Sequence, residues 1–286
     1  MENAIEVKHL SKHYKDFTLE DISLHVPAGS VLGLVGENGA GKSTFIKSLV
    51  GLLSSDYETL QLLGKDMKSE ETSIKEDIAV IFDTTHYNLQ FHPMFIGKLL
   101  SKVYANWNME TYVSYLKKFH LPPKKKLKEF SKGMKMKLEF AIAFSHDPKL
   151  LILDEATSGL DPIFRDEILD IIREFTEEEN HTVLMSSHIT SDLDKIADYI
   201  AFIHQGKLLF VKTYDDIREN YGIINCGKET LDTLHKDDIV AIQKEVYGYK
   251  VMVKNRLELQ NKIRDLDMER ASVEDVMLFY VKGEKI

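Results

Sequence analysis

Residues 36–44, GENGAGKST, carry the residue types that bind phosphate groups. They fit the pattern G-x-x-x-x-G-K-[ST], and they follow an apolar run and open a helical pattern, which is the context that this pattern requires. Glycines let the backbone curl so that successive N–H groups point at one phosphate, the lysine reaches the β- and γ-phosphates, and the next hydroxyl can bind Mg²⁺. The alternative is a glycine-rich turn that only caps a helix. We predict a nucleotide site made by Asn38, Gly39, Ala40, Gly41, Lys42, Ser43 and Thr44.

A second ligand for the metal is expected from a neighbouring strand. Residues 150–155, LLILDE, are an apolar run followed by two carboxylates, Asp154 and Glu155. Behind a phosphate loop, Asp154 is placed to complete the Mg²⁺ shell with Ser43, and Glu155 is the candidate base for an attacking water. Without that loop, the same pattern is equally compatible with a solvated strand end. Together these residues predict hydrolysis of a nucleoside triphosphate.

The apolar patterns around these motifs predict alternating strands and helices. Apolar residues recur at helical spacing after the phosphate loop, and residues 89–145 have a mostly helical pattern that prolines interrupt. Short apolar runs and amphipathic helices then alternate to about residue 210, which indicates a parallel sheet. The expected strands lie within residues 5–35, 150–155 and 181–187, and the expected helices within 43–53, 162–179 and 190–198.

The alternation of apolar strands and amphipathic helices ends at about residue 213. Two strand-like runs surround VYGYKVMV, a polar helical pattern covers residues 255–266, and Ser272 opens a last helix with a capping box that ends at Asp275. We therefore predict two parts: a nucleotide-binding domain at 1–212, with a helical subdomain at about 84–146, and a small α+β region at 213–286. That region could extend a dimer contact, bind a regulator or cover an apolar edge of the sheet, and the last is the default interpretation.

The composition restricts the class of protein. The chain has 286 residues, of which 43% are apolar and 29% charged, so it can bury a sizeable core. Its single cysteine, Cys226, cannot form an internal disulfide, and no secretory signal is visible, which favours a reducing, cytosolic setting. The net charge of −9 argues against nucleic acid as a partner. The apolar runs are far shorter than the roughly 20 residues needed to cross a bilayer, so we expect no direct membrane insertion.

Four motifs in a fixed order resemble those of one family. After the phosphate loop comes FSKGM at residues 130–134, and Asp154 follows Ser131 by 23 residues. SGLD at 158–161 and SSHI at 186–189 complete the order. This order resembles the nucleotide-binding domains of ABC transporters over roughly residues 5–210. The resemblance implies an α/β fold with a parallel core sheet, an antiparallel β subdomain and a helical subdomain, and an ATPase that uses ATP and Mg²⁺.

The resemblance also implies that two ATPase subunits bind ATP between them. In this family the helix opened by FSKGM presents its N-terminus to the γ-phosphate of the other subunit's ATP, so Ser131, Gly133 and Met134 would contact that nucleotide. A helix N-terminus suits this role because its partial positive charge favours an anion. Asp161 resembles the family's inter-subunit aspartate, and it can equally cap a helix that begins at Pro162. Ser131 could likewise be only a helix cap.

Two further residues take their roles from the resemblance alone. His188, in SSHI, would contact the γ-phosphate and help to orient the attacking water; the alternative is a plain surface or core histidine. Tyr14 lies upstream of the phosphate loop, where the family places an aromatic ring that stacks on adenine. The rival for that role is Phe17, and the alternative interpretation of Tyr14 is a core tyrosine.

Two sites depart from the family pattern. Lys132 and Met134 stand where glycine and glutamine are usual, and we expect an altered grip on phosphate because a cation can still serve an anion. Asp83, at the end of IAVIFD, stands where the family usually has a glutamine that touches Mg²⁺ and the water. A carboxylate is a harder, charged ligand, so Asp83 is a candidate metal ligand beside Ser43 and Asp154. Its alternative is a surface aspartate at the start of a loop.

Both departures and the segment ASVEDVMLFYVKGE resemble the ATP-binding subunits of bacterial exporters for antibiotics, bacteriocins and small toxic peptides, including phenol-soluble modulins. This resemblance implies a partner ATPase subunit, either a second copy or a paralogue, and an integral membrane permease that holds the chain at the cytoplasmic face of the membrane. The segment with Phe91, Met94 and Phe95 is the candidate docking site for the permease, or else part of the core. The alternative functions are a mechanical ATPase that is not coupled to transport and a regulatory ATP sensor.

Overall fold

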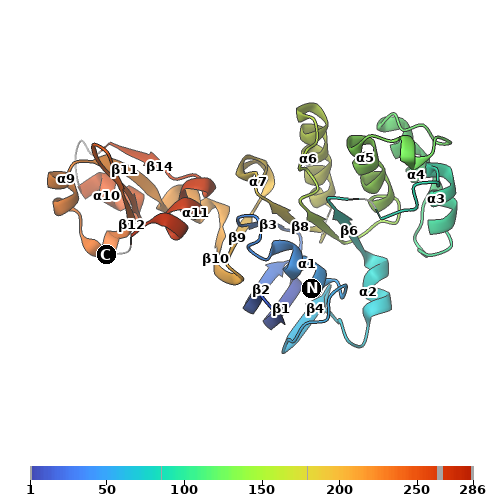
Figure 1. The fold of residues 1–286 in the computed structure, drawn as a ribbon, viewed down its shortest axis with the longest axis horizontal. Helices are drawn as coiled ribbons and strands as arrows, with labels where there is room; N and C mark the ends of the chain where they lie inside the picture. Colours follow the sequence, from blue (N-terminus) through green and yellow to red (C-terminus); the bar gives the residue numbers. More distant parts are fainter. Residues whose placement is uncertain (1, 85, 179, 263–266, 285–286) are drawn as a thin grey trace.

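The central sheet carries the predicted strands. The computed structural model describes residues 2–84, 86–178, 180–262 and 267–284. Within these residues the central sheet has the strand order β10-β9-β3-β8-β7-β6 (Figure 1). The strands from β9 to β6 run parallel, as predicted, and β10 pairs antiparallel with β9 at one edge. The bounds are β3 Val31–Val35, β6 Ile78–Phe82, β7 Leu150–Asp154, β8 Thr182–Ser187, β9 Tyr199–His204 and β10 Lys207–Thr213.

An antiparallel sheet packs over one face of the central sheet. Its strand order is β2-β1-β4-β5. Helix α1, Lys42–Leu49, packs with both sheets, because its Phe45 shares one hydrophobic core with Leu24 of β2 and Leu32 of β3. The neighbouring Val31 points to the opposite face and joins the other core, as side chains alternate along a strand. The bounds of this sheet are β1 Asn3–His13, β2 Thr18–Pro27, β4 Thr59–Leu62 and β5 Lys65–Asp66.

Helices cover the opposite face of the central sheet, and the predicted helical subdomain lies beyond its β6 edge (Figure 1). The rings of Phe140 and Phe164 meet edge to face at 6.5 Å and join two of these helices. In the described part of the chain, no helix combines the length and apolar character that crossing a bilayer needs. The bounds are α2 Glu71–Asp77, α3 Pro93–Leu100, α4 Met109–Lys118, α5 Lys132–Ala143, α6 Pro162–Glu177 and α7 Thr190–Ile196.

The C-terminal region contains a small antiparallel sheet with the order β12-β13-β11-β14. The predicted strand-like runs are β12 and β13, and the predicted capping box of Ser272 and Asp275 is present. The polar helix expected at 255–266 is α10 at Arg256–Lys262, and residues 263–266 lie outside the described residues. Four short helices and strands were not predicted: α8, β11, α9 and β14. The bounds are α8 Tyr214–Asn220, β11 Gly222–Cys226, α9 Lys228–Thr233, β12 Ile239–Glu245, β13 Gly248–Val253, β14 Met268–Arg270 and α11 Val273–Lys282.

Helix α11 returns to the central sheet and packs beside β9 and β10 (Figure 1). Its buried Val276 and Phe279 belong to the same hydrophobic core as Phe202 of β9. The ring of Tyr280 lies 5.0 Å from that of Phe210 on β10. Helix α11 of the C-terminal region therefore packs against β9 and β10, and the default interpretation, that this region serves to cover an apolar edge of the sheet, stays a prediction.

Candidate nucleotide-binding site

The phosphate loop connects the end of β3 to the start of α1, where the sequence predicts it. Gly39 and Gly41 have φ values of 82° and 114°, which residues with a Cβ rarely adopt. A Cβ on Gly41 would also stand 3.0 Å from the side chains of Leu19 and Phe17, so any other residue here would be strained and would press on both neighbours. Asn38 and Gly39 are exposed, Ala40, Gly41 and Lys42 are buried, and Ser43 and Thr44 are half-buried.

The ammonium group of Lys42 lies inside this loop. Its Nζ donates to the carbonyl oxygens of Gly36 at 2.7 Å and Glu37 at 3.2 Å. It also lies 3.2 Å from Oε1 of Glu155, although without the alignment of a hydrogen bond. Only 5% of the Lys42 side chain is exposed, so solvent screens its charge poorly. The loop thus combines curled backbone with one concentrated positive charge, which is the chemistry that a polyphosphate requires.

Asp154 is held at the end of β7 by two hydroxyl groups. Ser43 Oγ donates to Asp154 Oδ1 at 3.1 Å, and Ser186 Oγ of β8 donates to the same oxygen at 2.8 Å. This arrangement follows from the parallel pairing of β7 with β8, which places Asp154 opposite Ser186. A carboxylate and a hydroxyl at this separation form an oxygen donor set suited to Mg²⁺. The predicted pair of metal ligands, Ser43 and Asp154, therefore lies together and fits the ion.

Glu155 has an unusual backbone conformation and touches two other predicted site residues. Its φ is 53°, in the left-handed region, which is costly for a residue with a side chain and is often found at active sites. Its N–H donates to Ser186 Oγ at 3.0 Å. Its Oε2 lies 2.5 Å from Nδ1 of His188, and its Oε1 faces Lys42. The structure therefore brings Glu155, His188 and Lys42 together, as their proposed roles require.

Asp83 lies near these carboxylates without joining them. The parallel pairing of β6 and β7 places Phe82 opposite Asp154, so Asp83 follows at the same edge of the sheet. Its side chain is exposed, and it makes no hydrogen bond with Ser43 or Asp154 among the described residues. The placement leaves the metal-ligand role of Asp83 as a prediction.

The FSKGM motif forms the start of α5. Ser131 is the N-cap, and its Oγ accepts the N–H of Met134 at 3.2 Å. The first turn of the helix contains no acidic residue, and Lys132 and Lys135 lie there instead. A Cβ on Gly133 would meet nothing closer than Ser131 Oγ at 3.9 Å, so the backbone is open to an approaching group. Ser131 is therefore a helix cap in this protomer, and its exposed surroundings leave the helix start accessible to an anion.

Asp161 caps α6, as its position before Pro162 predicts. Its Oδ1 accepts the N–H of Phe164 at 3.0 Å. The loop before it is fastened by a buried network that the sequence analysis missed: Thr157 Oγ1 donates to Asp192 Oδ2 at 2.9 Å, and Arg165 Nε bonds both carboxylate oxygens of Asp192 at 2.8 and 2.9 Å. This network ties the loop before α6 to α7, which follows His188. The sequence analysis predicted a helix here and assigned no role to Asp192; an acidic residue in the first turn of that helix was the available signal.

The aromatic residues upstream of the phosphate loop lie on the turn between β1 and β2. Tyr14 is 44% exposed, and Lys12 Nζ lies 5.5 Å from the centre of its ring. Phe17 is half-buried, and its ring packs against Gly41 of the phosphate loop. Phe17 therefore borders the loop, and the more exposed Tyr14 lies beyond it, with the two ring centres 6.3 Å apart. The role of Tyr14 in stacking on adenine stays a prediction.

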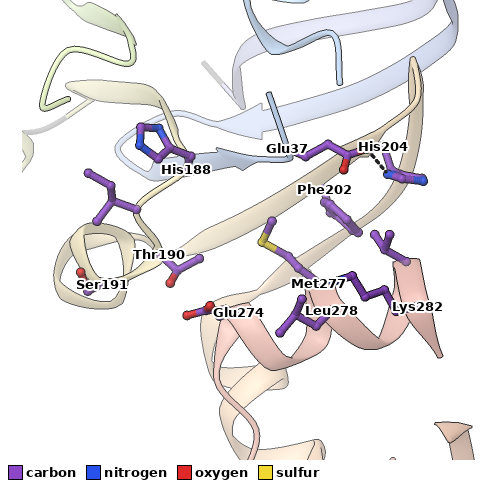
Figure 2. A pocket seen from close by; sticks show the side chains of 12 residues that line it. Glu37, His188, Thr190, Ser191, Phe202, His204, Glu274, Met277, Leu278 and Lys282 are labelled. Carbon is purple, nitrogen blue, oxygen red and sulfur yellow. Dashed lines mark ion pairs between the residues drawn. The ribbon is translucent and has the colours of Figure 1, made fainter. Parts of the chain in front are cut away.

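A cavity of about 500 Å³ lies between the nucleotide loops and α11. Figure 2 shows Glu37 and His188 on one side of it and Met277, Leu278 and Lys282 of α11 on the other. Glu37 forms an ion pair with His204 at 3.0 Å in its wall. The sequence analysis did not predict that the C-terminal region borders the nucleotide site.

Comparisons with known proteins agree with this arrangement. The family model described as ABC transporter matches residues 19–158. The chain is 34% identical over 244 residues to the lantibiotic transport ATP-binding protein SrtF of Streptococcus pyogenes, covering 82% of this chain and 97% of that one. It is 34% identical over 212 residues to the bacitracin transport ATP-binding protein BcrA of Enterococcus faecalis, covering 73% and 69%. A solved ATP-binding subunit of an ABC transporter has a TM-score of 0.69 at 29% identity, covering 75% of this chain and 92% of that chain.

The fold and the site define a phosphate-loop ATPase. With these similarities, the chain belongs to the ATP-binding proteins of ABC transporters, and it is a nucleotide-binding subunit with ATPase activity. The family, fold class and enzymatic activity predicted from the motifs are thereby confirmed. The relatives are named for transport, which favours a transporter subunit over a mechanical ATPase outside transport.

Proposed function

We propose that this subunit closes with a second ATPase subunit around two ATP molecules and thereby powers export through a separate membrane permease. The observation that carries the proposal is a division of the site into two halves. Lys42, Glu155 and His188 converge in one place, while Ser131 and Gly133 open a different helix whose N-terminus is accessible. A helix start with lysines and no acidic residue has a strong attraction for an anion.

In the closed dimer each residue acts on a defined part of ATP. Lys42 binds the β- and γ-phosphates together with the N–H groups of the loop, and Ser131 and Gly133 of the second subunit bind the γ-phosphate from the other side. Glu155 accepts a proton from the attacking water, and His188, already 2.5 Å from it, orients that water and the γ-phosphate. Tyr14 stacks on the adenine, and Asp161 contacts the second subunit across the interface.

Mg²⁺ fits the oxygen donors of Ser43 and Asp154, with Asp83 as a third candidate. When bound, the ion neutralises charge on the phosphate oxygens as the terminal bond breaks. Ser186 keeps Asp154 pointed at this place through its 2.8 Å hydrogen bond. Once the γ-phosphate leaves, nothing joins Lys42 of one subunit to Ser131 of the other, and the dimer opens.

The transported substrate is a peptide or a peptide-like antibiotic. The two relatives above are named for transport of a lantibiotic and of bacitracin. The permease would hold the subunit at the cytoplasmic face of the membrane. Phe95 and Leu99 of α3, which are 43% and 42% exposed, offer it an apolar contact, whereas Phe91 and Met94 pack against the core.

A Glu155→Gln variant tests the dimer mechanism. The amide keeps the size of the side chain but cannot take the proton, so we expect ATP turnover to fall by about 100-fold or more. We also expect the variant to sediment as a dimer with Mg²⁺ and ATP and as a monomer without them. Lys42→Ala in the same background is the matched control, and it should stay monomeric. Full turnover in Glu155→Gln would remove Glu155 as the base, and a variant that stays monomeric alone and with its permease would reject the dimer.

A further inference from the structure

A second cavity, of about 540 Å³, separates the end of β6 from the start of α5. Its walls carry charges of both signs. From the segment after β6 come Asp83, His86 and Tyr87, and from the first two turns of α5 come Lys132, Lys135 and Glu139. Burial raises the pKa of the Tyr87 phenol far above its ordinary value, so this group stays neutral. The cavity therefore brings together, in one protomer, Asp83 and Lys132, which are the two charged residues among the three that depart from the family pattern.

Lys132 is directed into its own protomer. Its Nζ lies 3.4 Å from the position that a Cβ on Gly159 would occupy, in the loop before α6. Neither Lys132 nor Asp83 makes a hydrogen bond or an ion pair with another described residue. An ammonium and a carboxylate on opposite walls of one cavity, each without a partner, attract one another more strongly as the cavity narrows and loses water.

Asp83 also needs a compensating charge. The register of β6 and β7 ends with Phe82 opposite Asp154, so Asp83 follows at the edge of the sheet where Asp154 ends its strand and Glu155 comes next. Carboxylates at one edge disfavour one another and an incoming anion. An uncharged amide at position 83 would not create this repulsion, and a glycine at position 132 could not relieve it.

We propose that Asp83 and Lys132 form an ion pair across this cavity when the subunit closes on ATP. The pair would fix the start of α5 against the end of β6, and so hold Ser131 and Gly133 in register with the nucleotide of the second subunit. Lys132 is then a positioning residue and Asp83 is its counter-charge, which is an alternative to the metal-ligand role that a Mg²⁺ titration of Asp83→Asn tests. This inference rests on the proposed dimer.

A double-mutant cycle tests the pair. Full-length Asp83→Gln, Lys132→Gly and the double variant are compared with the unmodified protein at saturating Mg²⁺, by kcat and KM for ATP. We expect each single change to lower kcat by about fivefold or more and the double variant to recover to within about twofold, because coupled residues are not additive. The matched control combines Lys135→Met with Asp83→Gln, because Lys135 lines the same cavity. In that double variant the fold changes in kcat of the two single substitutions should multiply.

A second measurement distinguishes an ion pair that forms when the subunit closes on ATP from one that is already present without nucleotide. The cycle is repeated in the Glu155→Gln background, with the dissociation constant of the ATP-bound dimer measured by sedimentation and with the thermal midpoint measured without nucleotide. We expect the two substitutions to be coupled in their effect on the dissociation constant of the dimer and to be independent in their effect on the thermal midpoint. The ion pair would be rejected if their effects on the dissociation constant simply multiplied or if the single variants had unchanged kcat. It would also be rejected if the coupling were equally large without nucleotide. If Glu155→Gln itself fails to dimerise, the proposed function fails instead, which keeps the two failures distinct.

Discussion

Ser186 Oγ donates to Asp154 Oδ1 at 2.8 Å. The same hydroxyl accepts the N–H of Glu155 at 3.0 Å, so one side chain of β8 fixes both the carboxylate proposed to bind the metal and the backbone of the proposed catalytic residue after it. Ser186 is fully buried, so a water molecule could not easily take the place of its hydroxyl group if the side chain were shortened. It is a supporting residue for the site, and it gives the first prediction.

Ser186→Ala should lower ATP turnover by about 10- to 100-fold, the usual effect of removing a hydrogen bond that orients a metal ligand. The change removes both bonds and leaves Asp154 free to rotate. Steady-state ATP hydrolysis by the purified subunit measures the effect. Ser145→Ala is the matched control, because Ser145 is a similarly buried serine whose hydroxyl, among the described residues, donates to the carbonyl oxygen of Ala141 and reaches no residue of the site. Equal turnover in the two variants would contradict the orienting role.

Asp83→Asn should leave folding intact and raise the Mg²⁺ concentration for half-maximal hydrolysis by about tenfold, because an amide oxygen is a weaker ligand than a carboxylate. Metal titrations at fixed ATP measure it. Unfolding midpoints of the two proteins should coincide, since the Asp83 side chain is exposed and makes no hydrogen bond with the described residues. Superimposable metal titrations would rule out a ligand role for Asp83.

Ser131 has two roles that substitution can separate. Ser131→Ala removes the cap of α5 and should cost about 1 kcal/mol in the free energy of unfolding. Ser131→Asp keeps a good cap, so stability should be retained, but its charge would repel the γ-phosphate of the second subunit. We therefore expect Ser131→Asp to unfold like the unmodified protein and to lose ATP-driven dimerisation in the Glu155→Gln background. Dimerisation at normal strength would show that Ser131 is a cap and nothing more.

His146 should make stability depend on pH. Burial lowers its pKa from the ordinary value of 6.5, and the carbonyl oxygens of Ile78 and Ile142 oppose this only in part. The folded protein thus binds this proton more weakly than the unfolded chain, so the contribution is complete above pH 6.5 and is lost as the pH falls further toward the folded-state pKa. His146→Phe keeps a ring that can stack on Tyr104, which lies 4.1 Å away, and removes the titration.

Denaturant unfolding at several values between about pH 7 and about pH 5 measures this difference. The free energy of unfolding should fall more steeply for the unmodified protein than for His146→Phe. Parallel curves for the two proteins would assign the acid sensitivity to other groups.

Local motifs made much of this site predictable. The phosphate loop is one continuous segment, and Asp154 ends a parallel strand, so both necessarily face the same sheet edge. The turn of Gln205 and Gly206, with φ values of 46° and 79°, explains the one departure from a parallel sheet, because so tight a connection can join only antiparallel strands.

Other features could not be predicted because they depend on packing between distant segments. A buried serine at position 186 has the same pattern as any small residue in a strand, and Asp192 looks like a solvated helix charge until Arg165 is placed beside it. The choice between Tyr14 and Phe17 depends on how a turn folds over the loop. The packing of α11 against the central sheet cannot be inferred from the spacing of apolar residues in its sequence. The elements α8, β11 and α9 are too short to show a hydrophobic periodicity of their own.

The shared core of α11 and β9 has a consequence for how the molecule comes apart. Phe279 and Phe202 lie in one continuous apolar cluster that also contains Ile223 and Met252 of the C-terminal sheet. Heat should therefore melt the ATPase core and the C-terminal region in a single cooperative transition. A protein shortened to residues 2–212 would lack the side chains that cover Phe202. The apolar surface exposed in this way would make it aggregate at concentrations at which the full-length chain does not.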